Sequence, residues 1–164
     1  MWTWYVQSRS AEFALDRLAE VLTPDGLALW LGSEVGEYLK KRAEARFAKE
    51  GDDVTGPWAP LKDATVQIRL GQNYGGAHPI NRRTGELEDW VVNSGWRAYP
   101  TSMGGSLAYP DNKPSGILLE KVQTAQGGSD NPRTPPRPVL GVNENDMLYV
   151  LSMFGTYIAE AVKV

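Results

Sequence analysis

The stretch "LALWLGSEVGEYLKKRAEARFAKEG", residues 27–51, decides how the rest of the chain is interpreted. Apolar side chains recur in it at every fourth position, which is the spacing of one face of an α-helix. These residues are Leu27, Leu31, Val35, Leu39, Ala43 and Phe47. Lysine, arginine and glutamate fill most positions on the other faces. The stretch therefore predicts one long helix near residues 27–50, which Gly51 ends.

Shorter periodic segments flank this helix. Spacings of three and four residues predict further helices over 10–22, 62–70, 115–126 and 144–162. Alternating or β-branched runs predict strands over 1–7, 90–99 and 104–110, of which the last two form a hairpin. We expect an α+β fold, in which a mostly antiparallel sheet of about four strands packs against two or three helices.

One domain is expected over residues 1–164, because a chain of this length buries a sizeable core by itself. Two segments stand out from the regular elements. Residues 51–86 form a long loop, a kind of segment that is usually functional. Residues 129–138, "SDNPRTPPRP", hold four prolines and predict an extended, proline-rich arm.

The C-terminal helix carries a distinct apolar stripe. Asn143 is a good N-cap, and apolar residues then step along one face by four, three, four and four positions. They are Met147, Leu151, Phe154, Ile158 and Val162. This face is predicted to be either core or interface.

Composition narrows the function classes. The 164 residues include no cysteine and a single histidine, His78, which removes disulfides, thiolate nucleophiles and cysteine metal sites. The net charge of −3 has the wrong sign for a protein whose main task is to grip phosphate backbones. No apolar run has the length of a membrane span, and the N-terminus lacks a signal-peptide pattern. We expect a soluble protein, made in the cytoplasm, with no membrane partner.

The sequence contains no recognisable catalytic, metal or cofactor motif. His78 with a nearby carboxylate could act as a general base, but it lies in a Gly/Pro-rich loop without a serine or cysteine nucleophile motif. The glycines of residues 71–79 lack the spacing of a phosphate-binding loop. We expect no enzyme, no metal and no cofactor, and keep a small hydrolase built on His78 as an alternative.

Loop arginines and a loop tryptophan are the candidates for contacts with other proteins, because Trp and Arg dominate binding hot spots. The candidate interface residues are Trp58, Arg82, Arg83, Arg133 and Arg137. The arginines could also touch DNA phosphates, but the chain has no basic domain, so contacts with protein are favoured. Core packing is the competing role for Trp2, Trp4, Trp90 and Trp96.

Four short elements, called the four landmarks below, follow one another along the chain. They are Arg46-Phe47 before a glycine turn, Trp58-x-Pro60-Leu61 followed by Thr65, Thr84-Gly85-x-Leu87, and Arg137-Pro138-x-Leu140-Gly141. In this order they resemble the phage virion morphogenesis family, the tail-completion and head-to-tail joining proteins of tailed bacteriophages. The resemblance spans about residues 10–162.

Two places depart from the family pattern. The family usually has basic residues after Thr-Gly and a serine at the start of the next strand, whereas this chain has Glu86, Glu88 and Trp90. The His-Gln-x-Gly type of segment before the proline-rich stretch is replaced by "KVQTAQGG", residues 121–128, with Gln126 and Gly127 as its candidate remnant.

The resemblance implies a structural virion protein without a catalytic site. Such proteins form a ring, most commonly a hexamer, that completes the tail or joins it to the head. Implied partners are further copies of the chain, the tail tube and the neck connector, while DNA passes through the channel without specific binding. The place would be the tail or neck of the virion, after assembly in the bacterial cytoplasm. Alternatives are another neck connector or tail-tube ring, and less favoured, a DNA-binding module.

Overall fold

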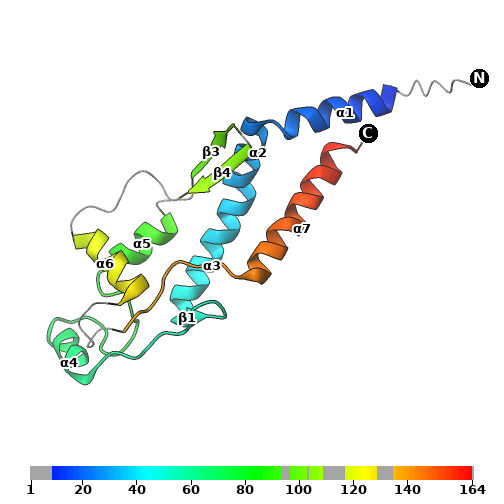
Figure 1. Ribbon diagram of the computed structural model, residues 1–164. Helices are drawn as coiled ribbons and strands as arrows, with labels where there is room; N and C mark the ends of the chain where they lie inside the picture. The colour runs from blue at the N-terminus through cyan, green and yellow to red at the C-terminus, as the bar shows by residue number, and fades with distance from the viewer. Residues whose placement is uncertain (1–8, 94–96, 103, 109–116, 129–134, 164) are drawn as a thin grey trace, which may run out of the picture. The chain divides into compact units, whose positions relative to one another are not determined.

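The computed structural model describes residues 9–93, 97–102, 104–108, 117–128 and 135–163 (Figure 1). The chain divides into two compact units. The first unit comprises Met1–Val35, Ala98–Ala108 and Glu144–Val164, and the second comprises Gly36–Arg97 and Tyr109–Asn143. Each unit is built from segments that are far apart in the sequence. The single domain over residues 1–164 stays a prediction.

The first unit is mainly helical. Its elements are α1 (Arg9–Val21), α2 (Pro24–Trp30), the π-helical turn η1 (Leu31–Val35), the hairpin of β3 (Arg97–Thr101) and β4 (Gly104–Ala108), and α7 (Glu144–Ala161). Thr23 caps α2, since its hydroxyl accepts a 3.1 Å hydrogen bond from the Gly26 amide and Pro24 occupies the first turn. The segment "TPDG" therefore begins a helix as well as ending α1.

Aromatic rings hold α7 against α2 in this unit. The centroid of the Trp30 ring lies 5.2 Å from that of Phe154 and 5.5 Å from that of Tyr157. On β4, a Cβ added to Gly105 would lie 2.7 Å from Leu31 Cδ1 and 3.0 Å from the Ala28 nitrogen. Only glycine allows the strand to approach α2 this closely.

The second unit contains the larger apolar core. Its elements are α3 (Gly36–Lys49), β1 (Gly51–Asp52), β2 (Gly56–Pro57), α4 (Asp63–Gly71), α5 (Glu86–Asn93) and α6 (Ile117–Gly127). β1 and β2 pair antiparallel, with Gly51 opposite Pro57. The core joins α3, α5, α6 and the loops between them; its buried residues are Ala43, Phe47, Trp58, Ile80, Leu87, Val91, Val92, Ala125 and Val139.

The predicted helix near 27–50 is confirmed as a helical segment, but it is not uniform. The helical residues run from Pro24 to Lys49, and η1 interrupts the α-helical hydrogen bonding between α2 and α3. Glycine and serine in "LGSEVG" are weak helix formers, and the Ser33 hydroxyl donates to the Leu29 carbonyl at 2.9 Å. The predictions over 10–22, 62–70 and 144–162 correspond to α1, α4 and α7.

The predicted strand over 90–99 is wrong in its first half. Residues 90–93 belong to α5, and the strand β3 begins at Arg97. The apolar residues Leu87, Trp90 and Val91 are spaced by three and four, and acidic residues fill the first helical turn. This helical spacing overrides the β-propensity of "WVV". The strand predicted over 104–110 is confirmed for Gly104–Ala108.

The α+β class is confirmed, but the single sheet of about four strands is wrong. The described residues form two separate antiparallel sheets of two strands each. They also contain more helices than the two or three predicted, and most of the structure is helical. The strand was overpredicted at 90–93, and β1 and β2 are too short to leave a periodic signal. The predicted strand 1–7, with Trp2 and Trp4, lies outside the described residues, as do Trp96, Arg133 and most of the arm 129–138.

Candidate functional site

Arg46, from the first landmark, is a buried arginine at the end of α3. Its Nη1 donates to the Val139 carbonyl at 2.9 Å, and its Nη2 donates to the Gly141 carbonyl at 3.0 Å. Its Nε donates to Asp52 Oδ2 at 2.8 Å. The rigid fork of a guanidinium suits three acceptors in fixed positions. Arg46 thus fastens the segment "RPVLG", residues 137–141, to α3.

Trp58 lies in the core of the second unit. Its side chain packs edge-on against Phe47, with ring centroids 5.4 Å apart and planes at 84°. Only 6% of Trp58 is exposed, and its Nε1 donates a 3.0 Å hydrogen bond to the Pro138 carbonyl. Its polar atom therefore has a partner inside the chain, and the residue is a packing anchor within this unit.

Arg137 in turn binds the backbone that follows Trp58. Its Nε donates to the Ala59 carbonyl at 2.6 Å and its Nη2 to the Pro60 carbonyl at 3.0 Å. Burial lowers the pKa of Arg137, because the charged form loses hydration. Two extended segments, 58–60 and 137–138, thus exchange side-chain hydrogen bonds in both directions.

Gln126 of α6 acts as a second clamp on the same segment. Its Oε1 accepts from the Val139 amide at 2.7 Å and from the Leu140 amide at 3.0 Å, and its Nε2 donates to the Leu140 carbonyl at 3.2 Å. The side chain thus satisfies a backbone stretch that has no strand beside it. The sequence indicated Gln126 only as a remnant of a family segment; its role as a clamp was missed.

Asp52 organises the turn after α3. Its Oδ1 accepts from the amides of Val54 and Thr55, both at 2.9 Å, while Arg46 binds the other oxygen. Burial by itself would raise the pKa of Asp52, but the hydrogen bonds from Arg46 and Thr55 and the charge of Arg46 outweigh it, so the pKa lies below its ordinary value. Asp52 is ionised at neutral pH and is used structurally.

Arg82 and Arg83 lie nearer the surface than Trp58 and Arg137. Arg82 forms an ion pair with Glu88, and both side chains are partly exposed. The exposed Arg83 donates to Gln72 Oε1 at 2.7 Å and lies over the ring of Tyr74, 5.0 Å from its centroid. Both arginines are held in defined positions. Of the five candidate interface residues, these are the two that a partner could reach among the described residues.

His78 forms a pair with Glu50. His78 Nδ1 lies 2.6 Å from Glu50 Oε2, and Glu50 Oε1 accepts from the Ile80 amide at 2.8 Å. The Glu50 carbonyl also accepts from the Trp58 amide at 2.7 Å, and Glu50 has a left-handed φ of 55° directly after α3. Glu50 therefore connects the end of α3 to the segment that contains Trp58 and to the segment that contains His78 and Ile80. This arrangement supports a structural role for the pair.

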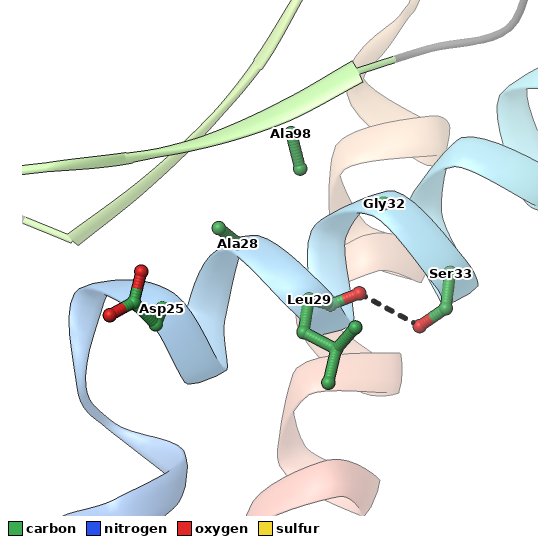
Figure 2. A pocket seen from close by; sticks show the side chains of 6 residues that line it. All are labelled: Asp25, Ala28, Leu29, Gly32, Ser33 and Ala98. Carbon is green, nitrogen blue, oxygen red and sulfur yellow. Dashed lines mark hydrogen bonds between the residues drawn. The ribbon is translucent and has the colours of Figure 1, made fainter.

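The first unit has a shallow hollow beside α2 (Figure 2). It is lined by Asp25, Ala28, Leu29, Gly32, Ser33 and Ala98. The Ser33 hydroxyl turns back to the Leu29 carbonyl, as the dashed line in Figure 2 shows, and is not directed at a ligand. Leu29 is 75% exposed at the rim. The hollow offers an apolar surface and no arrangement of catalytic groups.

No group of metal-ligating side chains occurs among the described residues. Within the same residues, no helix has the length and apolar character needed to cross a bilayer. The comparisons found no match. Neither a protein family model, nor a curated protein, nor a solved structure matches the chain.

Proposed function

We propose that the chain is a structural virion protein of a tailed phage, acting in tail completion or in joining the tail to the head. It forms a homo-oligomeric ring, with a hexamer as the expected state, between the tail tube and the neck connector. The proposal rests on the resemblance carried by the four landmarks. It has no catalytic step.

The observation that best supports this proposal is that all four landmarks contribute to one interior. Phe47, Trp58, Leu87 and Leu140 belong to the core of the second unit or pack against it, and Arg46 and Arg137 bind the backbone within it. Residues that a family shares only for folding are expected in such positions. An enzyme family would in addition share polar groups gathered in a cleft.

Exposed apolar surface gives a second line of support. Phe13 and Leu15, two large apolar side chains on α1, are each more than half exposed. Extended apolar surface of this kind is typical of proteins that assemble with others. A closed ring requires two different surfaces on each subunit. Arg82 and Arg83 are candidates for a polar contact in the other unit.

The acidic balance fits a channel for DNA. With a net charge of −3, the chain does not attract phosphate strongly, so DNA would pass without being held. A DNA-binding module would behave differently. Its binding would weaken steeply with salt and on the double change Arg82→Ala and Arg83→Ala.

The small hydrolase remains the alternative from another class, because His78 does face a carboxylate, that of Glu50. The change His78→Ala separates the two functions. A hydrolase would lose activity while its assembly state stayed unchanged, whereas a structural pair would affect only folding or assembly.

Electron microscopy of particles made without this protein tests the proposal directly. Filled heads separate from tails of finished or excess length are the expected result. Normal virions would refute both tail completion and joining. Native mass spectrometry of the purified chain would give the ring size, for which six subunits are expected.

A further inference from the structure

The helix α7 is apolar on the side that faces its own unit and also on the side that faces away. Its residues 147–159, "MLYVLSMFGTYIA", contain no charged side chain. Phe154 and Tyr157 contact Trp30, whereas Met147, Leu148 and Leu151 are each more than half exposed. Exposed apolar side chains gathered on one helix are typical of a contact with another protein. The outward side of α7 therefore calls for a partner.

The outward side of α7 has the pattern of a coiled coil. Six positions are spaced by four, three, four, three and four residues, which is the heptad spacing of a helix–helix seam. The α7 seam consists of Glu144, Leu148, Leu151, Gly155, Ile158 and Val162. All of these are exposed except Ile158, which is half-buried. The inward residues Phe154 and Tyr157 do not belong to this seam.

Gly155 lies in the middle of the seam without a reason in its own chain. Glycine inside a helix is unfavourable because it loses more backbone freedom than other residues. A Cβ added to Gly155 would meet no atom within 4 Å. Packing within the described chain thus does not require glycine here. A side chain from another molecule that closely approaches the helix would require it.

We propose that the α7 seam pairs antiparallel with the α7 seam of a second copy of this chain, about a two-fold axis. In this register Leu151 of one copy lies over Gly155 of the other, and Leu148 lies opposite Ile158. Large residues thus meet small or half-buried ones along the seam. Contacts of this kind are isologous, so each occurs twice.

Charge at the two ends of α7 selects the antiparallel orientation. Glu144 begins the helix, and Lys163 follows its last turn. Antiparallel pairing brings Glu144 of one copy beside Lys163 of the other and also opposes the two helix dipoles. Parallel pairing would place Glu144 beside Glu144 and Gly155 against Gly155, which leaves like charges together and a gap in the seam.

The size of the surface sets the expected affinity. Leu148, Leu151 and Val162 of the seam are exposed, and so is Met147 at its margin. At roughly 150–200 Å² for each full side chain, they present on the order of 400 Å² per copy. Together with the rest of the seam, the pair buries about 1,000 Å² in total, which is the lower end for specific contacts. We expect a dimer that dissociates in the micromolar range.

This pairing goes beyond the proposed function and does not rest on it. A closed ring uses two different surfaces of each subunit, whereas the α7 pairing uses one surface twice. The ring and the α7 pairing can therefore be disproved independently of each other. A ring without the α7 contact and an α7 dimer without a virion role would each be recognised.

Disulfide trapping tests the register, since the chain has no cysteine of its own. The double variant Leu148→Cys with Ala159→Cys places two thiols next to each other across the antiparallel pair, because Ala159 follows Ile158, the residue that lies opposite Leu148. Under mild oxidation at about 50 µM it should run as a covalent dimer. Within one helix the two positions are about 16 Å apart, so an intramolecular disulfide cannot form.

The single variant Ala159→Cys is the matched control. In the antiparallel pair its two thiols are about 16 Å apart along the helix, so it should stay uncrosslinked. Equal or stronger crosslinking of the single variant would indicate parallel pairing and overturn the proposal. Failure of the double variant to crosslink would also overturn it, whether or not the protein forms a ring.

A charge placed in the seam gives an independent measurement. Leu151→Asp should weaken dimerisation at least tenfold in sedimentation equilibrium. Thr156→Asp adds the same charge to the same helix, about 140° away from Leu151, and should leave dimerisation unchanged. Circular dichroism confirms that both variants are folded. A wild-type chain that stays monomeric up to about 200 µM, or equal effects of the two variants, would contradict the pairing.

Discussion

The indole Nε1 of Trp58 donates a 3.0 Å hydrogen bond to the carbonyl of Pro138, a residue 80 positions later in the chain. The adjacent Arg137 returns two hydrogen bonds to the carbonyls that follow Trp58. Two of the four landmarks are thereby locked to each other.

Replacement of Trp58 separates its hydrogen bond from its packing. Trp58→Phe should lower the free energy of unfolding by about 1–3 kcal/mol, because it leaves the Pro138 carbonyl without its donor and removes part of the ring volume. Trp58→Ala should cost about 3–5 kcal/mol. Urea denaturation at constant m value measures both. Equal effects of the two changes would mean that the apolar ring contributes nothing beyond the hydrogen bond.

Arg46 should be intolerant of lysine. Arg46→Lys keeps the charge but cannot place three donors at Asp52, Val139 and Gly141, so we expect a loss of about 3 kcal/mol in the free energy of unfolding. Arg17→Lys is the matched control, because Arg17 pairs with the exposed Glu20 at 2.9 Å. It should cost less than about 1 kcal/mol. Similar losses for the two variants would contradict the buried role of Arg46.

Asp52 should make stability depend on pH in the acidic range. Its pKa is lowered in the folded chain, so its contribution is present above its unfolded value of about 3.9 and is lost as the pH falls through the folded pKa. The difference in unfolding free energy between wild type and Asp52→Asn should be constant from about pH 5 to 7 and shrink below about pH 4. Urea titrations at each pH measure it. A difference that grows on acidification would refute this sign.

The extent to which the sequence predicts this structure depends on the range of the interactions. The helices α1, α4 and α7 follow from local spacing, and so does the segment from Pro24 to Lys49. The four landmarks can also be recognised in the sequence alone. Whether Trp58 and Arg137 face a partner or their own chain depends on contacts about 80 residues away, which no local pattern reports. The clamp by Gln126 cannot be predicted from the sequence for the same reason, although the residue lies just before the proline-rich stretch.

Arg82 and Arg83 should matter for assembly and little for folding. Their contacts with Glu88, Gln72 and Tyr74 are at least partly exposed, so Arg82→Ala with Arg83→Ala should change the unfolding free energy by less than about 1 kcal/mol. If they lie in the ring contact, native mass spectrometry should show a loss of the ring. Lys121→Ala, which removes another exposed ion pair of the second unit, should leave the ring intact. A ring that survives the double change would remove both arginines from the interface.

Gly155 should show opposite effects in the monomer and in the dimer. Gly155→Ala should stabilise the isolated chain by about 0.5–1 kcal/mol, because alanine is the better helix former and its methyl group meets no atom within 4 Å. In the antiparallel pair the same methyl group would lie beneath Leu151 of the other copy and push the helices apart. Thermal unfolding below about 1 µM should show the gain, and sedimentation equilibrium should show weaker dimerisation. A variant that gains in both measurements would mean that Gly155 faces no partner at close range.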